Sequence, residues 1–303
     1  MQSANGKLIR FVNERRLELI GLLFEPSQTK RDTIVIHVHG NFGNFYTNKF
    51  IWYMSKMYTE NNIAFLTFNL SAHDGLCEGY RDGELDYIGG AVADYDESIC
   101  DIDAAITYAK NLGYVNIFLQ GHSLGCDKTI EYILKSNCKD FSIILLSPVD
   151  SYAVQARWLR LHTGETITEQ IQRLKRNSHP QSKEMDWLNI CEYGAEGLND
   201  EWIYKIPVTR KTLLSILEGS AFKYLNLECG EDFVINNPTF VFLGMRDGLQ
   251  MSSQSEMRIF LSKHFEQVVF EDTLDSDHDI IGVEQVLIER IIAWIVKTTK
   301  NSI

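Results

Sequence analysis

The sequence lacks the long apolar runs that mark membrane and exported proteins. Among its 303 residues no run approaches the roughly 18 apolar residues that span a bilayer, so we expect no membrane span. The first residues, MQSANGKLIRF, contain no apolar stretch of signal-peptide length, and nothing in them favours export. We therefore expect a soluble, cytoplasmic protein.

Positive charge, metal-binding patterns and linkers are also scarce. The 29 basic residues face 41 acidic ones, and this formal charge of −12 excludes the basic face that a nucleic-acid partner requires. The six cysteines include no CxxC pair and no ligand spacing, so we expect reduced thiols and neither a metal nor a cofactor. The few prolines, five in all, mark no linker between domains, which favours one domain.

What is present is a regular alternation of strand-length and helix-length segments. At 45% hydrophobic residues the chain can bury a sizeable core, and runs such as TIVIHV and SIILL are apolar without alternation, as in strands buried on both faces of a parallel sheet. The expected strands are an opening hairpin of Leu8–Val12 and Leu17–Phe24, then Thr33–Val38, Ile63–Phe68, Val115–Leu119, Ser142–Leu146, Thr239–Leu243 and Gln267–Phe270. The expected helices are Lys49–Asn61, Ile99–Leu112, Leu124–Lys135, Ser253–His264 and Val283–Lys300. This order predicts an α/β fold whose mostly parallel sheet has helices on both faces.

One stretch interrupts the alternation. From Ser151 to Asn237 the sequence indicates helices and loops without a clear strand, so we interpret residues 151–237 as a helical cap inserted into a core of residues 1–150 and 238–303. Aromatic residues are frequent in this stretch: Trp158, Trp187, Tyr193, Trp202 and Tyr204. They suit either an aromatic-lined site for a bulky acyl or aryl ester, or simple packing of the cap onto the sheet.

A nucleophile motif follows the strand at Val115–Leu119. Gly121-His122-Ser123-Leu124-Gly125 is a G-x-S-x-G sequence between a strand and a helix, the context in which this motif forms a sharp turn. Glycines are needed there because the reversal leaves no space for side chains, and the turn raises the hydroxyl of Ser123 above the sheet edge. The start of the next helix supplies unpaired N–H groups and a positive dipole end for a developing oxyanion.

A serine hydroxyl needs a base, and the base needs an acid that orients it. Two loops after later strands supply candidates: Asp247 in GMRDG and His278 in DSDHD. We expect Asp275 and Asp277, which lie close to the histidine, to shape its loop. The other histidines compete poorly as the base because they fall in strands, in the nucleophile turn, or in helical and capping segments: His37, His122, His162, His179 and His264.

The oxyanion donors are expected in the loop after the first parallel strand and next to the nucleophile. The strand Thr33–Val38 runs into HGNFGN, whose glycines let backbone amides turn toward the site. We assign the two donors to the backbone N–H groups of Asn41 and Leu124.

HGNFGN, GHSLG, MRDG and DSDHD, in this order, resemble the motifs of the serine α/β-hydrolase superfamily over nearly the whole chain outside the cap. The order Ser, Asp, His is that of these enzymes. The loop NLSAHDGLCEG is similar to one that reads Arg-Gly-His-Gly-x-Ser in many members, but much of that pattern is replaced here. GHSLGCDK and SPVDS are similar to a branch of capped hydrolases that includes fungal siderophore-ester hydrolases.

Acidic residues gather between Asp74 and Asp103, with Arg81 as the single base. They could steer cationic substrates electrostatically, or they could be a solvated loop and helix start, where acidic residues are stabilising. A metal site is disfavoured because the stretch has no ligand-loop spacing.

The motifs predict a serine hydrolase that cleaves a small-molecule carboxylic ester, thioester or amide through Ser123, His278 and Asp247 by way of an acyl-enzyme. Two alternatives keep the same residues: an acyltransferase or lyase, and a binding protein that has lost turnover. Dehalogenase-type chemistry is excluded because it needs Asp in place of Ser123.

Overall fold

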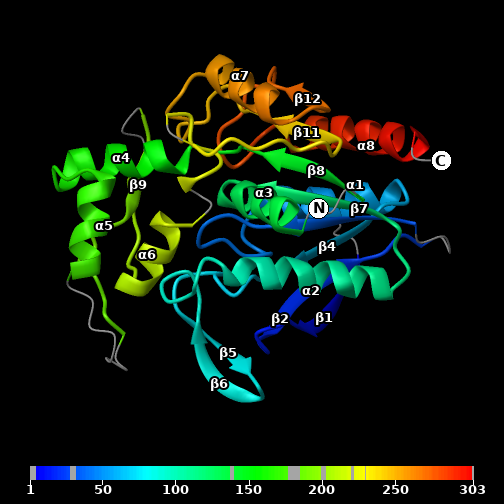
Figure 1. Ribbon diagram of the computed structural model, residues 1–303. Coiled ribbons are helices and arrows are strands. Elements are labelled where there is room, and N and C mark those ends of the chain that lie inside the picture. The colour runs from blue at the N-terminus through cyan, green and yellow to red at the C-terminus, as the bar shows by residue number, and fades with distance from the viewer. Residues whose placement is uncertain are drawn as a thin grey trace.

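The centre of the molecule is a twisted eight-stranded sheet (Figure 1). The computed structural model describes residues 5–27, 32–136, 140–176, 185–198, 203–219, 222–228 and 230–301. Within them the strand order is β1-β2-β4-β3-β7-β8-β11-β12. These strands are β1 (Gly6–Val12), β2 (Glu18–Phe24), β3 (Thr33–Val38), β4 (Ala64–Phe68), β7 (Asn116–His122), β8 (Phe141–Leu146), β11 (Thr239–Phe242) and β12 (Val268–Glu271).

Within the described residues only β2 runs opposite to the other strands of this sheet. β1 pairs antiparallel with β2, which pairs antiparallel with β4, and all later pairs are parallel. The predicted opening hairpin and parallel sheet are therefore confirmed. The carboxyl ends of the parallel strands lie along one edge, so the loops after β3, β7, β11 and β12 can meet there.

Helices cover both faces of the sheet. On one face lie α1 (Lys49–Glu60) and α8 (Glu284–Asn301), which bury Phe50 and Leu287 against Phe118 of β7. On the other lie α2 (Glu97–Asn111), α3 (Leu124–Ser136) and α7 (Gln254–His264). The described helices are too short or too polar to cross a membrane.

The helices of the stretch that we interpret as a cap form a group at one end of the sheet (Figure 1). These helices are α4 (Ser151–His162), α5 (Ile167–Arg176) and α6 (Arg210–Leu217), and their buried residues Leu159, Leu174 and Leu213 form a cluster that reaches Leu124 of α3. The expectation that this stretch contains no strand is wrong: β9 (Gly194–Glu196) pairs antiparallel with β10 (Ile203–Lys205). Such short strands leave no periodic signal.

A second hairpin went unrecognised in the acidic stretch. β5 (Cys77–Arg81) and β6 (Glu84–Ile88) pair antiparallel and project from the body of the fold (Figure 1). Both residues of their turn, Asp82 and Gly83, have positive φ angles of 54° and 81°. This is the backbone of a type I′ turn, for which Asp-Gly is a favoured sequence.

Candidate active site

The nucleophile turn joins β7 to α3 and is as tight as its glycines suggest. A Cβ at Gly121 would lie 2.4 Å from the carbonyl oxygen of Gly125, and a Cβ at Gly125 would lie 2.2 Å from that of Val38. Ser123 itself has a φ of 55°, a conformation that is strained for a residue with a side chain. The expected steric role of both glycines is confirmed, and such strain is typical of an exposed nucleophile.

Asp247 and His278 lie in contact although 31 residues separate them in the sequence. They occupy the loops after β11 and β12, and His278 Nδ1 lies 2.9 Å from Asp247 Oδ2 and 3.1 Å from Oδ1. The carboxylate of Asp247 is completely buried and also accepts a hydrogen bond from the backbone of Leu249 at 3.0 Å. This pairing leaves the opposite ring nitrogen of His278, Nε2, available for proton transfer.

The neighbouring aspartates shape the histidine loop. Asp275 pairs with Arg246 at 2.5 Å, and Asp277 Oδ1 accepts the backbone N–H of Ile281 at 3.0 Å. The contact that orients the imidazole is the one made by Asp247.

Electrostatics favour a basic imidazole at His278. Burial lowers the pKa of His278, but the negative charge of Asp247 and its hydrogen bond raise it, and the charges of Asp279 and Asp277 add to this effect. The net result is a pKa raised above its ordinary value of 6.5. A carboxylate that holds and charge-stabilises an imidazole is the arrangement of a general base.

His122 supports this loop from beneath, a role that the sequence did not indicate. Its Nε2–H donates to the carbonyl oxygen of His278 at 2.9 Å, and the two rings lie 5.1 Å apart. Burial and the charge of His278 lower the pKa of His122 to about 3, so it stays neutral.

The loop after β3 is fixed by its first residue. His39 Nδ1–H donates to the carbonyl of Gly40 at 2.9 Å, and His39 Nε2 accepts the N–H of Leu70 at 3.0 Å. Burial and the charge of Lys128 lower the pKa of His39, which keeps this neutral tautomer. A Cβ at Gly40 would lie 2.9 Å from the Cβ of Ser123 and 3.3 Å from its Oγ, so glycine permits close approach of this loop to Ser123.

The loop NLSAHDGLCEG braces the same segment from the other side. Asp74 Oδ1 accepts a hydrogen bond from Asn44 at 2.7 Å, and the backbone N–H of Asp74 donates to the carbonyl of Gly43 at 3.1 Å. The backbone N–H of Ser71 is held by the buried carboxylate of Asp101 at 2.7 Å. This loop therefore supports the shape of the predicted oxyanion segment.

These residues open onto one cavity of about 480 Å³ between the sheet edge and the cap. Its walls include Ser123, His278, Asn41 and Leu124, so four of the five predicted site residues line it and Asp247 lies behind His278. The cap contributes these lining residues: Ser151, Val154, Gln155, Tyr193, Gly194, Ala195, Tyr204 and Ile206. A site of this size and position suits a small organic substrate.

The cap aromatics divide between cavity and core. Tyr193 and Tyr204 line the cavity, whereas Trp158 is fully buried and Trp187 is 44% exposed. Trp202 lies outside the described residues. Packing of the cap therefore accounts for Trp158, while Tyr193 and Tyr204 are the aromatic residues that a bound molecule could contact.

Charge in the cavity comes from the histidine loop, not from the acidic stretch. None of the acidic residues from Asp74 to Asp103 lines the cavity, and several are bound elsewhere: Arg81, for example, pairs with Asp86 and Glu97. Asp277 and Asp279 do line it, beside Arg246.

Three of the remaining histidines lie in a strand or at a helix end, as predicted, although His37 also lines the cavity. His37 lies in β3, 2.9 Å from Gln120 Nε2; His162 is 3.0 Å from Glu196; and His264 donates to the carbonyl of Phe233 at 2.7 Å. His179 lies outside the described residues.

In the part of the chain that the structure describes, the cysteines form no disulfide and no cluster of side chains is suited to bind a metal ion. Cys77, Cys100, Cys126 and Cys191 are free thiols there, while Cys138 and Cys229 fall outside it. No group of three or more His, Cys, Asp or Glu side chains within that part could hold a metal ion.

Solved structures with the same architecture are known, whereas neither a protein-family model nor a curated protein matches the sequence. The α/β hydrolase GrgF from Penicillium sp. sh18 is 15% identical, with a TM-score of 0.67 over 97% of this chain and 98% of that one. The Pyrococcus furiosus esterase Pf2001 is 15% identical, with a TM-score of 0.60 over 98% and 91%. Est1E from Butyrivibrio proteoclasticus is 14% identical, with a TM-score of 0.61 over 98% and 100%, and has also been solved with ferulic acid bound. These likenesses, with the mostly parallel sheet, show that the chain has the α/β-hydrolase fold.

Proposed function

We propose that the protein is a serine hydrolase that cleaves a carboxylic ester, with Ser123 as nucleophile, His278 as base and Asp247 as the acid that orients it. The observation that carries the proposal is that Ser123, on its strained turn, shares a cavity with His278, whose Nδ1 is held by buried Asp247. Thioesters and amides pass through the same chemistry and belong to the same proposal.

In the first half-reaction the Ser123 oxygen attacks the acyl carbonyl while His278 Nε2 takes the hydroxyl proton. Asp247 stabilises the imidazolium that forms. The resulting tetrahedral oxyanion is received by the backbone N–H groups of Asn41 and Leu124, and the start of α3 adds the positive end of its dipole. The imidazolium then gives its proton to the leaving group, which departs and leaves an acyl-serine ester.

The second half-reaction repeats these steps with water. His278 removes a proton from a water molecule, the hydroxide attacks the acyl-serine carbonyl, and the same two amides receive the oxyanion. Collapse returns the proton from His278 to the Ser123 oxygen and releases the acid. An acyltransferase differs only in admitting an alcohol or amine in place of water.

The cavity charges favour neutral or cationic substrates over anionic ones. Asp277 and Asp279 line the cavity next to His278, and the lining residue Arg246 already pairs with Asp275. A carboxylate or polyphosphate group would therefore meet like charge near the reacting centre. An uncharged acyl ester small enough for a cavity of about 480 Å³ meets no such repulsion.

Reaction with a fluorophosphonate probe tests the proposal directly, because the probe phosphonylates an activated serine. We expect wild type to be labelled and to hydrolyse at least one member of a p-nitrophenyl ester series of increasing chain length, and Ser123→Ala to do neither. Labelling without ester turnover would favour amide, thioester or acyl-transfer chemistry. Absence of labelling at Ser123 would favour the binding-protein alternative.

A further inference from the structure

A hydrogen bond joins the cap to the segment that holds the proposed oxyanion donor. Asn41 Nδ2 donates to the hydroxyl oxygen of Tyr193 at 3.1 Å, across 152 positions of sequence. Tyr193 is only 7% exposed, and both residues line the catalytic cavity. Burial raises the pKa of Tyr193, so its hydroxyl remains neutral and can accept this bond.

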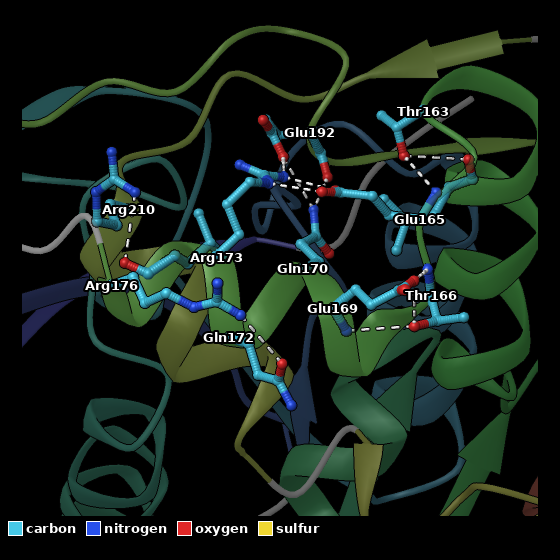
Figure 2. A network of polar contacts seen from close by, with 12 residues as sticks. Thr163, Glu165, Thr166, Glu169, Gln170, Gln172, Arg173, Arg176, Glu192 and Arg210 are labelled. Atoms are coloured by element: carbon cyan, nitrogen blue, oxygen red, sulfur yellow. Dashed lines mark hydrogen bonds and ion pairs between the residues drawn. The ribbon is translucent and has the colours of Figure 1, made fainter.

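Glu192, the residue before Tyr193, is held in place by a network of hydrogen bonds in the cap (Figure 2). The carbonyl of Glu192 accepts hydrogen bonds from Gln155 Nε2 at 3.0 Å and from Gln170 Nε2 at 2.8 Å. Its carboxylate accepts a charged hydrogen bond from Arg173 at 2.6 Å, and Arg173 also binds Glu165 through two bonds of 2.8 Å. Helices α4 and α5 therefore both hold the backbone at position 192.

Further contacts fix the backbone on both sides of this position. The carbonyl of Cys191 accepts the indole N–H of Trp158 at 2.8 Å, and the carbonyl of Tyr193 accepts the N–H of Ile206 at 3.0 Å. A Cβ at Gly194 would lie 2.7 Å from the Trp158 ring, so the chain packs directly on that side chain. Tyr193 thus projects from a rigid support.

The segment that donates this bond, residues 39–44, is less restrained in its middle than at its ends. His39 and Asn44 are anchored at its two ends, but between them Phe42 has a φ of 52° and Asn41 is only partly buried. The side-chain bond from Asn41 to Tyr193 restrains the middle of the segment, where the backbone N–H must point at the oxyanion. Small displacements of such a donor are costly, because losing one donor altogether typically costs about 10²–10³ in kcat.

We propose that Tyr193 is a positioning residue: its hydroxyl, held by the Gln155–Gln170–Arg173 network of the cap, fixes Asn41 so that the Asn41 N–H meets the oxyanion. This inference rests on the proposed serine hydrolase function. It makes the cap part of the machinery of catalysis as well as a wall of the cavity.

Tyr193→Phe removes the hydroxyl and keeps the buried ring. With the p-nitrophenyl ester that wild type hydrolyses fastest, we expect kcat to fall about tenfold while KM changes less than twofold. The fall in kcat is smaller than the loss expected for removing an oxyanion donor altogether, because the Asn41 N–H is displaced and not removed. Asn41→Ala breaks the same bond and keeps the backbone N–H, so we expect a similar loss and no further loss in the double variant. The matched control is Tyr132→Phe, which deprives an equally buried tyrosine of its bond to Asp103 away from the cavity and should leave kcat within twofold.

A second measurement needs no substrate. Amide hydrogen exchange in a peptide covering residues 39–44 should quicken at least threefold in Tyr193→Phe and stay unchanged in Tyr132→Phe. Unchanged exchange, additive losses in the double variant, or a rise in KM with unchanged kcat would each overturn the positioning role. If Ser123→Ala instead retains full turnover, the proposed function fails, and the exchange result still decides whether Tyr193 fixes this segment.

Discussion

His278 is the residue whose environment sets the pH dependence of the proposed reaction. Its pKa is raised above 6.5, since the charge and hydrogen bond of Asp247 outweigh burial. The base must be neutral to accept a proton, so kcat/KM should rise with pH through a midpoint above 6.5. In Asp247→Asn the raising charge is lost, so we expect the midpoint to move to lower pH and kcat to fall by about 10⁴.

A pH–rate profile of both proteins, with a substrate whose leaving group does not titrate between pH 5 and 9, checks this expectation. Asp275→Asn is the control, because Asp275 binds Arg246 and is not among the groups that raise the pKa of His278. A midpoint that stays in place in Asp247→Asn would argue against His278 as the base.

The proposed catalytic residues could be selected from the sequence, whereas the residues that contact and hold them could not. Ser123, Asp247 and His278 stand in short motifs at strand ends, so local pattern was enough to select them. His122 and Tyr193 form hydrogen bonds with partners 156 and 152 positions away, and no local pattern reports such a contact. Their roles follow only from the folded geometry.

Among the secondary-structure elements, the first helix of the cap, α4, is held at its start by Asp150. It caps α4, accepting the N–H of Ala153 at 2.9 Å, and its other oxygen accepts the N–H of Leu227 at 3.0 Å. Its removal leaves two partly buried N–H donors without their partner, so we expect Asp150→Ala to lower the free energy of unfolding by about 2 kcal/mol. Asp150→Asn keeps one acceptor oxygen and should lose less than half of this.

Urea denaturation of the three proteins at pH 7 measures the difference. Equal stability of wild type and Asp150→Ala would mean that the carboxylate contributes nothing to holding the cap.

Strands were predicted correctly where both faces are buried, and they were missed where they are short or exposed. β3 was predicted at its observed bounds, and β8 and β11 to within one residue, because strands buried on both faces read as continuous apolar runs. In β5 and β6 most residues are exposed or half-buried, and charged residues break the apolar pattern. The Asp82-Gly83 turn was the signal that could have located this hairpin.

For the whole molecule, the alternation of strands and helices predicted a mostly parallel α/β sheet, and the resemblance of the four motifs to those of serine α/β-hydrolases predicted the α/β-hydrolase fold. How the cap sits on the core was not predictable, since it depends on contacts such as the packing of Leu159 and Leu213 toward Leu124. The same contacts create the cavity, so the volume of the cavity and the residues that line it could not be predicted from the sequence either.

The stability of the whole molecule in acid should depend on histidines buried as neutral rings. Burial lowers the pKa of His37 to about 3, against 6.5 for an ordinary histidine, and repulsion between the protonated rings of His37 and His122 adds to this shift. Below pH 6.5 His37 binds a proton in the unfolded chain but stays neutral in the folded protein. The contribution of neutral His37 to stability is therefore complete above about pH 6.5 and is lost as pH falls toward about 3. Between pH 7 and pH 5 this amounts to about 2 kcal/mol.

His37→Gln isolates this contribution. The variant loses the contact with Gln120 and should be less stable at pH 7, yet its free energy of unfolding should fall by about 2 kcal/mol less than that of wild type between pH 7 and pH 5. Groups with the opposite tendency, such as Asp101, whose pKa burial raises to about 6, are common to both proteins and cancel in the comparison. Between pH 7.5 and pH 9 the two urea-denaturation series should run parallel, because His37 is neutral in both states. Parallel behaviour below pH 6.5 as well would show that folded His37 titrates like an exposed histidine, and would contradict its buried neutral state.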